Sequence, residues 1–127
     1  MPAALVTGAG GGLGLAVARM LAGRGYEVAA TDVDGAAAER AAEAIGSGAG
    51  AQQLDVTDAE ACHDAARAVV SRSGALNVWV NNAGVLIPGV VYEQDPAAHR
   101  TMLDVNALGT FNGTRAECVD VEPRANA

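Results

Sequence analysis

The glycine-rich segment at residues 7–14, with the sequence TGAGGGLG, constrains the fold of this chain more than any other feature. It follows the apolar run of residues 3–6 and precedes a helix-length apolar run at residues 15–21. Glycine tolerates positive φ and lets a phosphate approach the backbone, and the first N–H groups of a helix have no intrahelical partner. The pattern therefore predicts a strand, a turn and a helix whose N-terminus binds a pyrophosphate.

A flexible loop is the alternative interpretation of these glycines, because glycine clusters are also typical of loops. Two features of the flanking sequence favour the phosphate site. The cluster lies between apolar runs of strand and helix length. In addition, Asp32 follows Gly14 at about the spacing at which a carboxylate binds a ribose. We therefore expect a dinucleotide site in a βαβ unit.

Four motifs occur in order along the chain. They are Thr-Gly-x-x-x-Gly-x-Gly with Gly8, Gly12 and Gly14, then Asp55-Val56, Asn81-Asn82-Ala83-Gly84 and Val105-Asn106. Together they resemble the motifs of the short-chain dehydrogenase/reductase family, and the resemblance covers residues 3 to about 115. It implies an NAD(P)-dependent oxidoreductase that transfers a hydride between its cofactor and an alcohol or carbonyl. It also implies a Rossmann-type fold.

The alternation of apolar segments predicts the same class of fold. Strand patterns lie at residues 3–6, 26–31, 51–54 and 75–80, and helical patterns lie at residues 13–24, 34–45, 58–72 and 95–117. This order predicts an α/β fold, a doubly wound parallel sheet truncated to about four strands in the spatial order 3-2-1-4. Residues 1–127 then form a single NAD-binding domain, with residues 118–127 as an irregular tail.

Two of these segments also carry an expectation about burial. The helix at residues 13–24 is apolar nearly all round, which is typical of a helix buried against a sheet that is covered on both faces. The strand at residues 75–80 is apolar almost without interruption, which predicts a central strand covered on both faces. Trp79 within it is expected to belong to the core.

Asp32 predicts a preference for NAD over NADP. A carboxylate at the end of the second strand accepts hydrogen bonds from ribose hydroxyls and repels a 2′-phosphate. In the family that the chain resembles, members that favour NADP carry a basic residue at two places, which here hold Gly11 and Val33. The alternative for Asp32 is a solvated loop aspartate.

The resemblance assigns cofactor contacts to two further segments. Asp55 and Val56 match family positions that contact the adenine, although the run Asp-Val-Thr-Asp also predicts helix capping. Asn82, Ala83 and Gly84 match the turn beside the ribose and pyrophosphate, where composition alone predicts only a turn. The predicted cofactor-binding residues are Gly8, Gly11, Gly12, Leu13, Gly14, Asp32, Val33, Asp55, Val56, Asn82, Ala83 and Gly84.

The catalytic residues that the resemblance implies are largely missing from the sequence. Asn106 matches the helix asparagine that holds a water linked to the catalytic lysine, but the chain contains no lysine. A buried helix asparagine bonded to backbone is therefore the better interpretation of Asn106. The only tyrosines, Tyr26 and Tyr92, lie outside a Tyr-x-x-x-Lys segment, and no serine follows a fifth strand.

We therefore expect a truncated chain that retains dinucleotide binding and lacks catalysis. A nucleotide-binding or dimerisation module and a non-functional remnant are the alternatives. No metal site is predicted, because His63 and His99 lie on predicted helices without ligands at metal spacing. Cys62 and Cys118 are expected to be free thiols.

Composition limits the partners. The net charge is −7 without a basic cluster, which argues against nucleic acid and anionic membranes as partners. No apolar run has membrane-spanning length and the N-terminus enters a strand at once, so a cytoplasmic protein is expected. Self-association is expected through the edge of the fourth strand or through the fourth helix.

Overall fold

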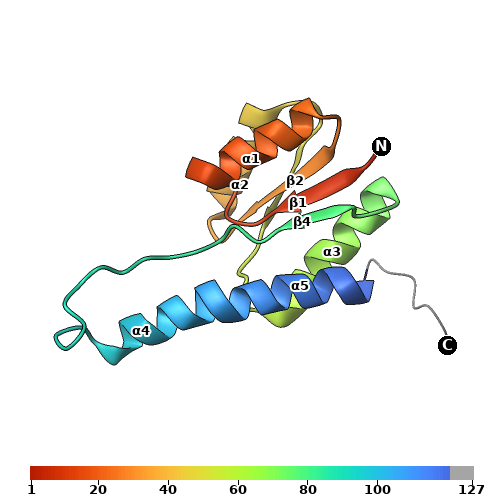
Figure 1. The fold of residues 1–127 in the computed structure, drawn as a ribbon. Helices are drawn as coiled ribbons and strands as arrows, with labels where there is room; N and C mark the ends of the chain where they lie inside the picture. Colours follow the sequence, from red (N-terminus) through yellow and green to blue (C-terminus); the bar gives the residue numbers. More distant parts are fainter. Residues whose placement is uncertain (121–127) are drawn as a thin grey trace.

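The computed structural model describes residues 1–120, and its centre is a parallel sheet. Strand β1 (Ala3–Val6) pairs with β2 (Glu27–Asp32) on one side and with β4 (Val78–Val80) on the other. Strand β3 (Gly50–Gln53) pairs with β2, so the order is β3-β2-β1-β4. The predicted Rossmann-type order 3-2-1-4 is therefore confirmed (Figure 1).

Three helices connect these strands, and each begins where the sequence changes from a turn to an apolar pattern. They are α1 (Gly12–Gly23), α2 (Gly35–Ile45) and α3 (Ala59–Ser73). Asp34 caps α2 and Asp58 caps α3, because each carboxylate accepts hydrogen bonds from backbone N–H groups of the first turn. Gly74 ends α3 in the left-handed conformation, with φ 81°.

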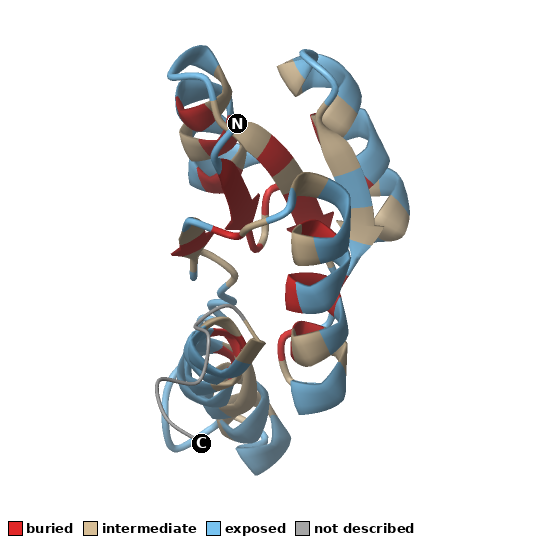
Figure 2. Cartoon of the chain, turned by 90° about the vertical axis from the view of Figure 1, so that its right-hand side faces the viewer, coloured by how far each residue is buried: buried red, intermediate tan, exposed pale blue. Residues whose placement is uncertain are grey.

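The sheet separates two apolar cores. Ala3 and Leu5 of β1 face the core that α3 and the last helix cover, whereas Ala4 and Val6 face the core that α1 and α2 cover. This alternation follows from the two-residue period of a strand. All four residues of β1 are fully buried, and Figure 2 shows buried residues mainly in the strands and on the inner sides of the helices.

Helix α1 differs from its prediction. Only Gly14, Ala18 and Leu21 are buried, a stripe with helical spacing that faces the sheet. Leu13 is 73% exposed and Met20 is 46% exposed, because no other described element covers the outer side of the helix. Helix α1 packs against a sheet that is covered on both faces, as expected, but it is half-solvated, which its apolar composition did not predict.

Strand β4 is shorter than predicted and lies at an edge. It pairs with β1 alone among the described strands, so the expectation of a central position was wrong for residues 1–120. Before the strand begins, the Asn77 side chain accepts a hydrogen bond from Ala3 N at 2.9 Å in place of a ladder carbonyl. Trp79 is buried in the core beside α3, as expected.

The last part of the described chain is one long helical rod. It consists of α4 (Pro96–Leu103), the π-helical segment η1 (Asp104–Leu108) and α5 (Gly109–Asp120). Asp95 caps its start and Pro96 occupies its first turn, as the sequence predicts. The π-helical segment was not predicted.

The rod extends beyond the sheet at one end and packs on it at the other. Figure 1 shows α4 pointing away from the sheet after the irregular connection at residues 81–95, while α5 lies beside α3. Residues 118–120 form the end of α5, so the expectation that they belong to an irregular tail was wrong. The rest of the expected tail, residues 121–127, lies outside the described residues. None of the described helices is long and apolar enough to cross a membrane.

Candidate functional site

The glycine-rich turn after β1 has a backbone that only small residues permit. Gly8 and Gly12 have positive φ values of 63° and 54°. A Cβ on Gly14 would lie 2.5 Å from Asn82 Nδ2 and closer still to the carbonyl oxygen of Gly8. Gly11 has open space around it, so a Cβ at this position would meet no other residue.

Helix α1 begins in this turn without a capping side chain. Gly11 occupies the N-cap position, and no side chain bonds the N–H groups of the first turn. The helices α2, α3 and α4 each have an aspartate there instead. The first N–H groups of α1 are consequently available to an anion, and the helix dipole favours negative charge at that end.

Asp32 links the end of β2 to the glycine turn. Its Oδ2 accepts a hydrogen bond from Gly10 N at 3.0 Å, and its Oδ1 accepts one from Asp34 N at 3.0 Å. Gly10 must be small here, since a Cβ on it would lie 2.6 Å from Asp32 Oδ2. Asp32 is half-buried and held in place, which differs from the alternative of a freely solvated loop residue.

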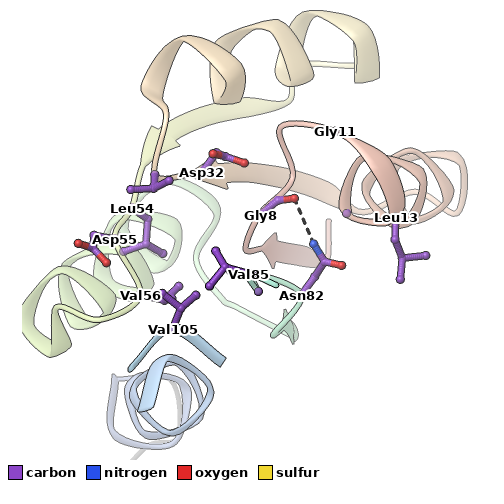
Figure 3. A pocket seen from close by; sticks show the side chains of 14 residues that line it. Gly8, Gly11, Leu13, Asp32, Leu54, Asp55, Val56, Asn82, Val85 and Val105 are labelled. Atoms are coloured by element: carbon purple, nitrogen blue, oxygen red, sulfur yellow. Dashed lines mark hydrogen bonds between the residues drawn. The ribbon is translucent and has the colours of Figure 1, made fainter. Parts of the chain in front are cut away.

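Asn82 ties the turn after β4 to the turn after β1. Its Nδ2 donates to the carbonyl oxygens of Thr7 and Gly8 at 3.0 and 3.1 Å, and the bond to Gly8 is drawn in Figure 3. The Thr7 hydroxyl accepts from the backbone N–H groups of Asn82 and Ala83, both at 3.0 Å. Thr7 is almost fully buried, and the sequence analysis missed this role.

The segment after β3 forms a hydrogen-bonded turn and caps α3. Asp55 Oδ1 accepts from the backbone N and the hydroxyl of Thr57, at 2.9 and 2.7 Å, which closes the turn. The capping residue of α3 is Asp58, so the capping interpretation is correct for that position. The Val56 carbonyl accepts from Asn112 Nδ2 at 2.9 Å, which connects this turn to α5.

These turns surround one cleft at the carboxyl ends of the strands. Its volume is about 340 Å³, and its wall includes eleven of the twelve residues predicted to bind a cofactor, all except Gly12 (Figure 3). The wall comprises Gly8, Gly11, Leu13, Gly14, Asp32, Val33, Leu54, Asp55, Val56, Asn82, Ala83, Gly84, Val85 and Val105. Three of these, Leu54, Val85 and Val105, were not predicted. None of the fourteen is a basic residue.

Asn106 lies beside this cleft in the π-helical segment. Its Oδ1 accepts from Val85 N and its Nδ2 donates to the Val85 carbonyl, both at 2.8 Å. The predicted hydrogen bonds of Asn106 to backbone are confirmed. Asn106 itself is exposed rather than buried, because the connection at residues 81–95 to which it bonds lies on the outer side of the helical rod. The bonds hold Val85 against the cleft.

The remaining polar candidates lie outside the cleft. His99 Nε2 contacts Gln94 Oε1 at 2.9 Å, and Tyr92 is 84% exposed. His63 Nδ1 lies 2.5 Å from Asp120 Oδ2, a carboxylate partner that the sequence analysis missed. Within residues 1–120 there is no group of three or more side chains suited to a metal.

Both cysteines are free, as expected, and they differ in environment. Burial, followed by the negative charges of Asp58 and Asp55, raises the pKa of the Cys62 thiol to about 11. Cys118 is exposed. Cys62 is therefore an inert core thiol at neutral pH.

Comparison with known proteins agrees with this geometry. A family model described as short chain dehydrogenase matches residues 2–122. The chain belongs to this family. The short-chain dehydrogenase fold also explains the order of the strands, since a solved 3-ketoacyl-(acyl-carrier-protein) reductase from Brucella melitensis, complexed with NADH, superposes with a TM-score of 0.86 at 34% identity.

Curated relatives in the short-chain dehydrogenase family include two bacterial enzymes. The 2,3-dihydro-2,3-dihydroxybenzoate dehydrogenase of Bacillus subtilis is 34% identical over 116 residues, and the L-tagatose-forming galactitol 2-dehydrogenase of Cereibacter sphaeroides is 39% identical over 114. Each match covers 89% of this chain and 44% of the relative. The structural match covers 91% of this chain and 48% of the reductase. This chain thus spans less than half the length of these proteins.

Proposed function

We propose that this chain is the cofactor-binding half of a short-chain oxidoreductase and that its cleft binds NAD. The observation that carries the proposal is the cleft itself, which joins the uncapped N-terminus of α1 to the carboxylate of Asp32. An anionic group fits the N-terminus of α1, and a pair of ribose hydroxyls fits the carboxylate of Asp32. The glycine turn leaves space for a pyrophosphate, because a Cβ on Gly11 would meet nothing within 4 Å.

Each part of the dinucleotide has residues suited to it. The backbone N–H groups at the start of α1 would bind the pyrophosphate, and Asp32 would accept from the adenosine ribose. The apolar side chains of Val33, just after β2, and of Leu54 and Val56, just after β3, would contact the adenine. Val85 and Val105 would border the nicotinamide end.

The preference for NAD over NADP rests on charge. Two carboxylates, Asp32 and Asp55, belong to the wall of the cleft, and no basic residue does. A 2′-phosphate beside Asp32 would add two negative charges with nothing opposite them. Calorimetric titration with NAD, ADP-ribose and NADP tests the proposal: NAD and ADP-ribose should bind, and NADP should bind more weakly. Absence of binding by all three would refute it.

We expect no hydride transfer by the 127-residue chain itself. Bound NAD would supply the hydride acceptor, but a base or acid must still move the proton on the substrate oxygen, a contribution of about 10²–10⁴-fold. The chain has no lysine to lower the pKa of a phenol, and Tyr92 is exposed on a connection outside the cleft. We propose binding without turnover.

A dimerisation module is the second candidate, and specific features favour it. The outer edge of β4 has no partner strand within residues 1–120. The helical rod also exposes large apolar side chains, with Leu103 at 66% and Phe111 at 73%. An unpaired edge and an apolar helix both favour association. Sedimentation at several protein concentrations tests this candidate.

The cytoplasmic location that the sequence predicts for this protein remains a prediction.

A further inference from the structure

Helix α5 touches the wall of the cleft at its first turn. Asn112 Nδ2 donates to the Val56 carbonyl at 2.9 Å, and a Cβ on Gly109 would lie 2.5 Å from Val56 Cγ2. Val56 belongs to the cleft wall, on the side where we place the adenine. The position of α5 therefore affects the position of this wall.

Helix α5 packs closely on α3, but it buries only small side chains. Its buried residues are Gly109, Gly113 and Ala116, while Phe111 and Val119 are 73% and 48% exposed. Burial of an alanine methyl contributes far less than burial of a leucine or phenylalanine side chain. Polar contacts consequently add to the attachment of α5, and their loss is expected to be felt at a helix that buries no large side chain of its own.

The shortest polar contact of α5 lies at the far end of the helix. Asp120 Oδ2 lies 2.5 Å from His63 Nδ1, and Asp120 Oδ1 accepts from Arg67 Nη1 at 3.3 Å, so two donors of α3 share one carboxylate. The side chains of His63 and Asp120 are only 15% and 11% exposed. Because both side chains are largely shielded from solvent, breaking the contact would leave a poorly solvated polar group, which costs free energy. We call the contacts of Asp120 with His63 and Arg67 the α3–α5 clasp.

We propose that the α3–α5 clasp sets the position of α5 and, through Asn112 and Gly109, holds Val56 in the cleft wall. His63 and Asp120 are then positioning residues for nucleotide binding, although neither belongs to the cleft. The helix transmits the constraint because its twelve residues form a stiff element fixed at both ends. The statement about nucleotide affinity rests on the proposed function, whereas the statement about Val56 does not.

The test compares Asp120→Asn with the unchanged chain. Asparagine offers one acceptor oxygen to two donors, so the clasp loses one bond and its charge. Hydrogen exchange of the ligand-free chain should become faster at residues 54–58 and 109–120 and stay unchanged at residues 3–14. The Kd for ADP-ribose should rise about 2- to 30-fold, the range found for residues that act on a site through other residues.

Three further variants separate positioning from general damage. Glu117→Gln removes a charge from the same helix outside the clasp and should behave like the unchanged chain. His63→Asn keeps an N–H donor near the place of Nδ1 and His63→Gln does not, so the asparagine variant should keep more of the affinity. If Asp120→Asn does not fold, His63→Gln decides on the same two measurements.

The outcomes are distinct. Unchanged exchange at residues 54–58 in the clasp variants would overturn the proposal, and so would faster exchange spread evenly over all helices. If the unchanged chain binds no ADP-ribose, the proposed function fails, and the exchange measurement alone still decides whether the clasp holds Val56.

Discussion

Replacing Asp32 by alanine should reduce the preference for NAD over NADP. The carboxylate makes two backbone hydrogen bonds, to Gly10 N and Asp34 N, and it borders the cleft. The substitution therefore has two effects. It loosens the glycine turn, which weakens both dinucleotides alike, and it removes the group that we expect to distinguish them.

The change in the ratio of the two Kd values comes only from removing the group that distinguishes the dinucleotides. The loosening of the glycine turn weakens both dinucleotides alike and cancels in the ratio. Hydrogen bonds to a charged group contribute about 1.5–3 kcal/mol, so NAD should lose about 10- to 150-fold beyond the common loss. NADP has no such bond to lose and is relieved of charge repulsion. The ratio of the Kd for NADP to the Kd for NAD should consequently fall by at least about tenfold.

Asp34→Ala is the matched control for this experiment. It removes the same charge two residues later, where the carboxylate caps α2 by accepting from Ala36 N and Ala37 N and does not border the cleft. It should lower the free energy of unfolding by about 1 kcal/mol and leave the ratio unchanged. Isothermal titration of both variants with both dinucleotides gives the result. An unchanged ratio in Asp32→Ala would refute the role assigned to Asp32.

Four other outcomes are expected. Gly14→Ala should lower the free energy of unfolding in urea by about 1–3 kcal/mol, since its Cβ would meet Asn82 Nδ2, whereas Gly23→Ala, with open space, should be neutral or slightly stabilising. Cys62 should react with a thiol reagent only on unfolding or as the pH approaches its raised pKa of about 11, so in native chain at pH 8 only one thiol per chain should be titrated. The purified chain should produce no NADH from simple alcohols, and steady production would contradict the missing proton relay. Sedimentation should show association that strengthens with salt, which screens the net charge of −7, and a monomer at all salt concentrations would contradict it.

The fold was largely predictable because its signals are local. The runs at residues 3–6 and 26–31 have strand length, and the aspartates at positions 34, 58 and 95 mark helix starts that the structure confirms. The errors concern neighbours distant in sequence. An apolar helix or strand cannot show which of its sides the remaining chain covers, so Leu13 and β4 were both expected to be more enclosed than they are.

The cleft was predictable where its residues carry a motif and unpredictable elsewhere. The spacing of the glycines and Asp32 identified one part of the wall, and the resemblance to the family supplied the rest of the predicted residues. Leu54 and Val85 carry no motif, and Val105 belongs to a motif that was not assigned to the cofactor. The contact between His63 and Asp120 joins positions 57 apart, so no spacing rule could indicate it. Such contacts depend on how α5 packs on α3.

Because α1 has no capping side chain, binding of a dinucleotide at its N-terminus would become part of the folding equilibrium. For α2, α3 and α4 the chain itself satisfies the helix start, whereas for α1 a bound phosphate would complete it. A ligand that binds only the folded state adds RT ln(1 + [L]/Kd) to stability, about 2.7 kcal/mol at a hundredfold excess over Kd. In a small domain whose sheet ends in two edge strands, β3 and β4, within residues 1–120, the supply of dinucleotide would then affect how much of the protein is folded.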